Sequence, residues 1–150
     1  MKFIIHQATL QDAGHINSLF ISYRHFYDKS SDPAQTLYYL QERLRNGESV
    51  IFYAEDLHGV VIGFTQLYPL YCSLELKRIW VLYDLFISVT ERRHGIASHL
   101  MKRAESFARE TGAAFMLLDT AVDNISAQAL YKKQGYRVDT DFVHYKLELQ

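Results

Sequence analysis

The first residues of the chain arrange apolar and polar positions as a short strand followed by a helix. Residues 3–5 form a short apolar run, which favours a strand. After it, Thr9 and Asp12 are typical of a helix start. The apolar positions that follow recur every three or four residues, the spacing of one buried helix face, and they are Ile16, Leu19, Phe20 and Tyr23. This stretch therefore predicts a strand and then an amphipathic helix.

A second helix and a hairpin are predicted next. The helix starts at the serines, aspartate and proline of residues 30–33, where a polar side chain caps and proline occupies the first turn. It ends near the Asn-Gly pair at residues 46–47. Residues 49–55 and 60–68 are then two β-rich runs, and the turn residues 56–59 between them indicate a hairpin.

The middle of the chain holds its longest apolar run. Residues 78–89, RIWVLYDLFISV, are rich in β-branched and aromatic side chains and predict a strand buried on both faces, interrupted by one charge, Asp84. Helical spacing follows and ends at Gly112, with apolar positions Ile96, Leu100, Ala104 and Phe107. Residues 114–119 then predict another buried strand.

The last part of the chain predicts a short helix and a final strand. Residues 126–134 have helical spacing and are closed by Gly135, and residues 142–149 alternate apolar and polar positions as a half-buried strand does. The predicted order of elements is β-α-α-β-β-β-α-β-α-β. Without repeats or a linker, it indicates a mixed α/β fold of the α+β type, formed by a single domain over residues 1–150.

Composition and charge exclude several classes of function. The chain has 150 residues, 49% of them apolar, enough to bury a core. Its net charge of −1 gives no general attraction to nucleic acid or to an anionic membrane. No run approaches the roughly 20 apolar residues of a membrane span, and the first residues do not resemble a secretory signal. We therefore expect a cytoplasmic protein. Cys72 is the single cysteine, so no internal disulfide is possible.

Residues 92–97, RRHGIA, stand between the long apolar strand and the next helix and are the first candidate site. A helix N-terminus presents unpaired N–H groups and a partial positive charge, which bind phosphate. Gly95 and Ala97 are small where a diphosphate would approach the backbone. The polar side chains around them are Arg92, Arg93, His94 and Ser98. The alternative is a solvated turn, since the stretch matches neither the nucleotide P-loop nor G-x-G-x-x-G.

A second stretch, NISAQALYKKQGY at residues 124–136, changes the interpretation of the first. Together they resemble the Gcn5-related N-acetyltransferase (GNAT) superfamily, whose coenzyme A loop follows Q/R-x-x-G-x-G/A, here Arg92, Gly95 and Ala97. The next motif of the family, N-x-x-A-x-x-L-Y-x-x-x-G-F/Y, falls without a gap on Asn124, Ala127, Leu130, Tyr131, Gly135 and Tyr136. The stretch RIWVLYDLFISVTERRHGIA most resembles the subgroup of yeast histone and polyamine acetyltransferases and their bacterial relatives.

The resemblance implies a fold and a cofactor site. The fold would be a mixed, largely antiparallel sheet with a splayed central pair of parallel strands and helices on both faces. Acetyl-CoA would be the co-substrate, and no metal is expected. The backbone of Leu85, Phe86 and Ile87 would bind the pantetheine arm and polarise the thioester carbonyl. The pyrophosphate would be held by Arg92, Arg93, His94, Gly95, Ile96, Ala97 and Ser98. Asn124 and Tyr131 would add further cofactor contacts.

The resemblance also implies direct transfer of an acetyl group to a primary amine. An amine with a pKa of about 10.4 is only about 0.1% neutral near pH 7.4, so its proton has to be removed. The matching acids are Asp84 and Asp119, and we expect burial to raise the pKa of the one that acts, or water to relay the proton. Asp84 is favoured because a charge inside so apolar a run needs a reason, an ion pair with Arg or Lys being the alternative. Tyr131 matches the family's general acid for the leaving thiolate, and packing under its helix is the alternative.

The resemblance indicates the amine acceptor and the protein partners less directly than it indicates the cofactor. We expect a small amine, a polyamine or an amino acid ahead of a protein lysine, bound by the first two helices through residues that include Phe26, Tyr27, Tyr38 and Tyr39. Residues 142–149 are a candidate interface for a homodimer. A CoA-binding sensor without catalysis is an alternative function, whereas binding to nucleic acid conflicts with the net charge. A metal site and an acyl-cysteine on Cys72 are disfavoured, because the histidines lack metal-ligand spacing and the cysteine lacks an identified base.

Overall fold

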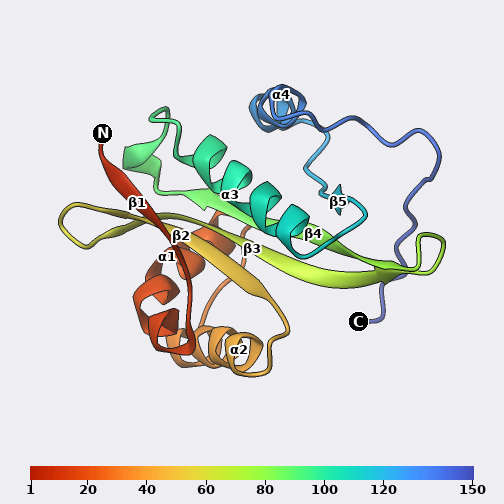
Figure 1. Ribbon diagram of the computed structural model, residues 1–150. Coiled ribbons are helices and arrows are strands. Elements are labelled where there is room, and N and C mark those ends of the chain that lie inside the picture. The colour runs from red at the N-terminus through yellow and green to blue at the C-terminus, as the bar shows by residue number, and fades with distance from the viewer. The chain divides into compact units, whose positions relative to one another are not determined.

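The computed structural model describes residues 1–150 as two compact units, Met1–Asp119 and Thr120–Gln150 (Figure 1). The first unit holds a five-stranded sheet and three α-helices, and the second holds one helix. None of the helices is long and apolar enough to cross a membrane.

The sheet places its strands side by side in the order in which they occur along the chain. They are β1 (Phe3–Gln7), β2 (Val50–Asp56), β3 (Val61–Cys72), β4 (Lys77–Ile87) and β5 (Met116–Leu117). The first four are antiparallel neighbours. β4 and β5 run parallel and pair at two positions, Trp80 with Met116 and Val81 with Leu117. This parallel pair stands at one edge of a sheet that is otherwise antiparallel, and the predicted mixed fold is confirmed.

Helices cover both faces of the sheet. Figure 1 shows α1 (Ala13–Phe26) and α2 (Pro33–Arg45) on one face and α3 (Ile96–Glu110) on the other. Single 3₁₀ turns at Leu10–Asp12 and Val89–Glu91 precede α1 and α3.

The helix starts predicted from the sequence are confirmed by their caps. The backbone N–H of Thr9 donates to Asp12 Oδ2 at 2.7 Å, so the turn before α1 is closed by the two residues that indicated it. Asp32 caps α2 by accepting a hydrogen bond from the N–H of Ala34 at 3.1 Å, and Pro33 occupies the first turn.

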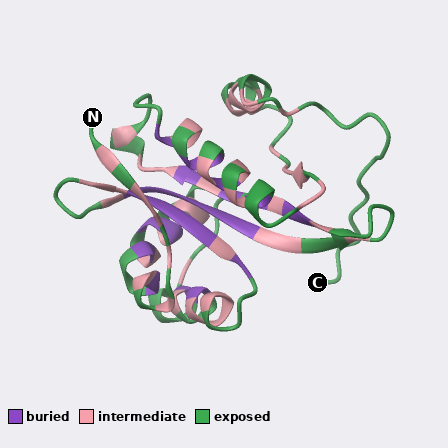
Figure 2. Ribbon diagram, in the orientation of Figure 1, coloured by how far each residue is buried: buried purple, intermediate pink, exposed green.

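The buried residues of the first unit lie on the sheet and on the helix faces turned toward it (Figure 2). On the α1 and α2 face, the core contains Ile16, Phe20, Leu40, Ile51, Phe64 and Phe86. Gly63 of β3 faces α3, where a Cβ would lie 2.7 Å from Ile87 Cδ1 and 3.1 Å from Ile96 Cγ2. A glycine at this point therefore lets α3 approach the sheet closely.

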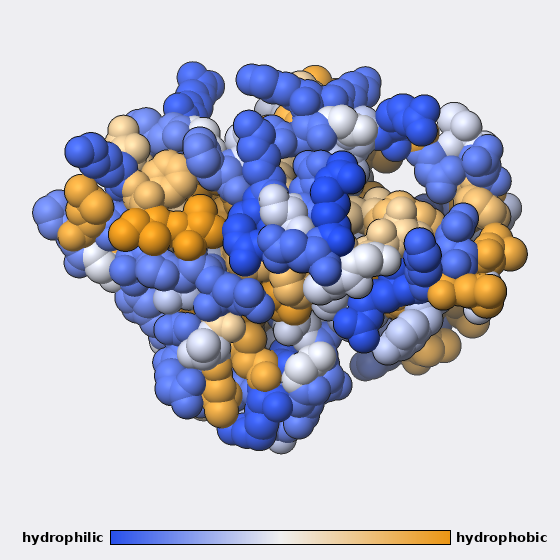
Figure 3. Space-filling model, viewed as in Figure 1, coloured by the Kyte–Doolittle hydropathy of each residue, from blue (hydrophilic) through white to orange (hydrophobic).

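The outward face of α3 is hydrophilic, as Figure 3 shows in the centre of the view. Its exposed residues include His99, Lys102, Arg109 and Glu110. The buried positions of the same helix are Ile96, Leu100, Met101, Ala104 and Ala108. α3 thus has the single apolar face that its sequence predicts.

Two predicted strands differ from the structure. The buried strand expected over residues 114–119 is reduced to β5, and its flanking residues Phe115 and Asp119 are exposed. The strand expected over residues 142–149 is wrong, because the second unit contains helix α4 (Ile125–Lys133) and no strand. The alternating apolar side chains of that segment are exposed instead, and without a paired neighbour the backbone has no ladder of hydrogen bonds to hold it extended.

Candidate active site

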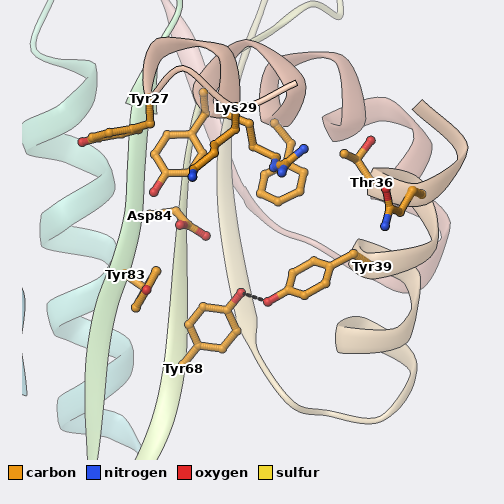
Figure 4. Close-up of a pocket in the computed structure, with 11 residues that line it drawn as sticks. Tyr27, Lys29, Thr36, Tyr39, Tyr68, Tyr83 and Asp84 are labelled. Atoms are coloured by element: carbon orange, nitrogen blue, oxygen red, sulfur yellow. Dashed lines mark hydrogen bonds between the residues drawn. The ribbon is translucent and has the colours of Figure 1, made fainter. Parts of the chain in front are cut away.

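A pocket of about 500 Å³ lies in the first unit, between α1, α2 and the strands β3 and β4. Aromatic side chains form most of its wall: Phe20, Tyr23, Tyr27, Tyr39, Tyr68 and Tyr83. The charged residues at the wall are Asp84, Arg24 and Lys29. Figure 4 shows Tyr39 and Tyr68 on one side of the pocket and Asp84 on β4.

Asp84 is the acid of this pocket, and it is almost completely buried, with 4% of its surface exposed. Gln66 Nε2 donates to Asp84 Oδ2 at 2.6 Å, and the Tyr23 hydroxyl also hydrogen-bonds this carboxyl group. Ser49 Oγ in turn donates to Gln66 Oε1 at 2.7 Å, which orients the amide. The carboxyl group is therefore held in one position by a buried chain of polar side chains.

Burial raises the pKa of Asp84 above its ordinary value, and the hydrogen bonds from Gln66 and Tyr23 oppose that effect. No ion pair involves Asp84. The alternative explanation of this charge, a buried pair with an arginine or lysine, is therefore wrong. A buried carboxyl group without a cationic partner is suited to exchange a proton with a ligand of the pocket.

A bulge in β4 gives Asp84 its place. Gln66 of β3 faces Asp84 and Leu67 faces Leu82, so Tyr83 has no partner in β3. Such an extra residue shifts the alternation of side chains along the strand. Leu82 and Asp84 consequently face opposite sides of the sheet, where both are buried, whereas Tyr83 is 64% exposed. The expectation that this strand is buried on both faces is wrong at Tyr83.

Three tyrosine hydroxyls of the pocket interact with one another or with Asp84. The hydroxyl oxygens of Tyr39 and Tyr68 are hydrogen-bonded at 2.6 Å (Figure 4). Burial raises the pKa of both Tyr23 and Tyr68, and the negative charge of Asp84 adds to the effect in each case. These hydroxyls therefore stay protonated and act as hydrogen-bond donors and acceptors toward a ligand.

The second half of β4 leaves one edge without a neighbouring strand in the first unit. β5 ends its pairing with β4 at Val81, while β4 continues through Leu85 and Phe86 to Ile87. The opposite edge of this segment is paired with β3 throughout. Within the first unit, the backbone of residues 85–87 thus lies at an unpaired edge, to which an extended ligand can add hydrogen bonds as a strand would.

The loop before α3 leads the chain into a helix N-terminus that no side chain caps. Arg93 and Gly95 both have positive φ angles, +69° and +76°, so the backbone turns sharply twice. A Cβ on Gly95 would meet nothing closer than His99 Nδ1 at 3.7 Å. Positive φ at a residue other than glycine is strained, and such strain is common at ligand-binding turns. A backbone turn of this kind at the positive end of a 15-residue helix fits a diphosphate group.

The basic side chains of that loop are arranged differently from the expected cluster. The Arg92 guanidinium lies over the rings of Phe26 and Phe86, 5.6 Å from each centroid. His94 Nδ1 lies 3.2 Å from the carbonyl oxygen of Glu91, and Arg93 is exposed. In the structure the fit to a diphosphate therefore rests first on the backbone of the loop, because the Arg92 guanidinium already contacts aromatic rings.

The other predicted site residues lie outside the pocket. Asp119 is exposed and does not contribute to the pocket wall, so it is not brought together with Asp84. Asn124 and Tyr131 belong to the second unit. There Asn124 caps α4 by accepting from the N–H of Ala127 at 3.2 Å, and the Tyr131 ring lies 6.3 Å from that of Tyr136.

The pocket lies against the first two helices, where the sequence predicted the acceptor site, and it contains part of the expected residues. Tyr27 and Tyr39 line the pocket, whereas Phe26 and Tyr38 do not. The sequence analysis did not identify Tyr68, Arg24 or Lys29. Nothing in the local pattern marked them, because their place in the pocket wall depends on how α1, α2 and β3 pack together.

Comparisons with known proteins agree with this geometry. The Acetyltransferase (GNAT) family pattern matches residues 16–136. The uncharacterized N-acetyltransferase YhfO of Bacillus subtilis (strain 168) is 43% identical over 145 residues, which is 97% of each chain. A crystal structure of a probable acetyltransferase has 41% identity and a TM-score of 0.93, covering 100% of this chain and 99% of the other. An aminoglycoside N-acetyltransferase solved in complex with CoA shares the fold, with 19% identity, a TM-score of 0.83, and coverage of 97% and 95%. With the family pattern matched over most of its length, this chain belongs to the GNAT family of acetyltransferases.

Proposed function

We propose that this enzyme transfers the acetyl group of acetyl-CoA directly to a primary amine, with both substrates bound at once. The observation that carries the proposal is the buried Asp84, which has a raised pKa and no cationic partner and lies in a pocket beside the open edge of β4. The pocket would hold the amine, and the edge would hold the arm of the cofactor.

Acetyl-CoA as the acetyl donor is supported by the family and by the solved relative that contains CoA. In this chain the backbone of Leu85, Phe86 and Ile87 would hold the pantetheine arm, and residues 92–98 the pyrophosphate. The open edge of β4 and the uncapped N-terminus of α3 fit these two parts. Bound there, acetyl-CoA supplies a thioester whose carbonyl carbon the amine attacks.

Asp84 acts as the general base in this proposal. Its carboxylate accepts a proton from the ammonium form of the acceptor, after which the nitrogen forms a bond to the carbonyl carbon. The bond from that carbon to sulfur then breaks, and the nitrogen releases its second proton to solvent as the amide forms. A raised pKa brings the carboxyl group closer to the pKa of its proton donor, which improves the transfer. The leaving thiolate needs a second proton, and Tyr131 as its source stays a prediction.

The acceptor is a small molecule in this proposal, since the pocket volume of about 500 Å³ lies in the range of small-ligand sites. The narrower likeness to yeast histone and polyamine acetyltransferases is not supported by the comparisons, which give 43% identity to a Bacillus subtilis N-acetyltransferase. Residues 1–150 acting as one catalytic domain is supported by the family match, which spans parts of both units. A cytoplasmic location and a homodimer also stay predictions, and light scattering at high protein concentration tests the dimer.

The test compares the two candidate acids in one assay. Release of CoA from acetyl-CoA is followed with a thiol reagent across a panel of amines, using the wild type, Asp84→Asn and Asp119→Asn. We expect Asp84→Asn to lower kcat about 10²- to 10⁴-fold and Asp119→Asn to leave it within about twofold. The reverse result would transfer the role to Asp119. If acetyl-CoA binds but none of the amines in the panel is acetylated, the result would contradict the proposed function and favour a CoA sensor.

A further inference from the structure

The charge of the pocket wall differs from what a site for polycationic amines needs. Asp84 is its one acid, and Arg24 and Lys29 are its two cations. No salt bridge engages either cation. The wall therefore carries one positive charge in excess when Asp84 is ionised and two when Asp84 is protonated. An amine that enters the pocket meets one acid and two positive charges.

Arg24 is held in place by the segment that carries Lys29. Its Nη1 donates to the carbonyl oxygen of Ser30 at 2.7 Å and to Ser31 Oγ at 2.5 Å. The N–H of Lys29 donates to the carbonyl oxygen of Arg24 at 3.0 Å. These bonds fix the connection between α1 and α2 to the end of α1, and they use only Nη1 of the five-donor guanidinium of Arg24. Figure 4 shows Lys29 extending into the pocket from this connection.

The acid and the two cations of the pocket wall attract different parts of an acceptor. Asp84 attracts the amine, whereas two unpaired cations at the wall attract an anion, and a guanidinium and an ammonium are the usual partners of a carboxylate. A second amine on the acceptor would be brought toward Arg24 and Lys29 with no acid to meet it, and like charges at such a site are unfavourable.

The rest of the wall suits an apolar body between these two charges. Phe20 and the five tyrosines offer ring faces to a ligand, and their hydroxyls are already occupied in part by hydrogen bonds with one another and with Asp84. Ring faces bind apolar and aromatic groups by contact area and stacking. Gln35 and Thr36 add polar groups, but aromatic rings form most of the wall.

We propose that the acceptor is an amine that also carries a carboxylate, joined by an apolar or aromatic body. Its carboxylate is bound by Arg24 and Lys29, and its amine is directed to Asp84. This inference rests on the proposed function, because it assigns the substrate class of the same pocket. It separates this enzyme from acetyltransferases that accept polycations such as aminoglycosides.

The first test uses pairs of acceptors that differ in the carboxylate alone. Phenylalanine is compared with phenethylamine, and 6-aminohexanoate with hexylamine, so that the spacing between amine and carboxylate also varies. Spermidine and kanamycin represent the polycations. We expect the better of the two carboxylated amines to exceed its partner in kcat/KM by about tenfold or more, and both polycations to be poorer still.

Variants then assign the preference to the cations. Lys29→Glu is expected to lower kcat/KM for the carboxylated amine about tenfold or more and to raise it for spermidine. Lys2→Glu changes the net charge equally at an exposed position outside the pocket and is expected to change neither. Arg24→Lys keeps the positive charge while removing the forked donor, which preserves the connection between the helices better than a neutral residue would.

Two different failures can be told apart by measuring binding as well as turnover. Calorimetry with the CoA-loaded protein compares the two amines of each pair. If both amines of each pair are acetylated and bound equally well and Lys29→Glu changes neither, the carboxylate inference is overturned while the proposed function stands. If no amine is acetylated but the carboxylated one binds preferentially, the proposed catalysis fails and the assignment of Arg24 and Lys29 is supported.

Discussion

The loop that enters α3 and the pocket between α1, α2, β3 and β4 are built in different ways. The loop is seven consecutive residues, 92–98, and what it offers a ligand is backbone at a helix N-terminus. The pocket draws its wall from two helices, their connection and two strands, and what it offers is side chains. A site of consecutive residues leaves a local motif, whereas a site assembled across the fold does not. The four predictions below test this difference.

The largest effect is expected at Tyr131, the one proposed catalytic residue that belongs to a local motif. Tyr131→Phe should lower kcat about 10²- to 10⁴-fold and leave the Kd for acetyl-CoA unchanged, because a positioned acid contributes that much to a proton transfer. Both quantities come from the CoA-release assay and a binding titration. Tyr136→Phe is the control, since the family motif accepts either residue there. Normal turnover in Tyr131→Phe would show that the motif supplies packing and no acid.

At the loop before α3, two matched glycine substitutions should distinguish an effect on cofactor binding from an effect on stability. Gly95→Ala forces a side chain into a φ of +76°, and Gly112→Ala does so at +73° at the far end of the same helix. Each should lower the free energy of unfolding by roughly 1–2 kcal/mol. Gly95→Ala alone should also weaken acetyl-CoA binding, by about five- to tenfold, because the turn that presents the N–H groups is altered. Equal affinities in the two variants would mean that RRHGIA is a solvated turn.

In the pocket, the pH dependence of stability should reveal the burial of Asp84. Its pKa in the folded protein is raised by burial, so the contribution of the protonated group to stability is complete below the unfolded pKa and is lost as pH rises through the folded value. Asp84→Asn removes this titration and keeps a neutral group of similar shape. The melting temperature of Asp84→Asn should therefore rise relative to that of the wild type as pH rises. The expected change is about 2–4 °C for each kcal/mol of difference in the free energy of unfolding. A difference that does not change with pH would contradict a raised pKa.

The smallest effect is expected from a single hydroxyl of the pocket wall. Tyr68→Phe removes the hydrogen bond to Tyr39, and we expect the KM for the amine to rise about two- to fivefold with no change for acetyl-CoA. Tyr71→Phe, on the same strand but 78% exposed and outside the pocket, should change neither KM. A change in the KM for acetyl-CoA would show that the pocket and the loop before α3 do not act independently.

The fold could be predicted in large part because most of its elements carry strong local signals. The caps at Thr9 and Asp32 and the apolar faces of α1 and α3 all lie where the sequence indicates. The predictions that were wrong concern strands. Residues 142–149 alternate as a strand does, but pairing needs a neighbour, and alternation by itself does not supply one.

The sequence by itself determined the family, the loop before α3 and the suspicion that Asp84 has a function. Each depends on residues that are close along the chain, where spacing alone sets the geometry. Tertiary structure decided the rest. The bulge at Tyr83 turns Asp84 inward, Gln66 of the neighbouring strand holds it, and the packing of α1 and α2 brings Arg24 and Lys29 to the same cavity. These arrangements depend on contacts between distant segments, and no local pattern of residues encodes which segments meet.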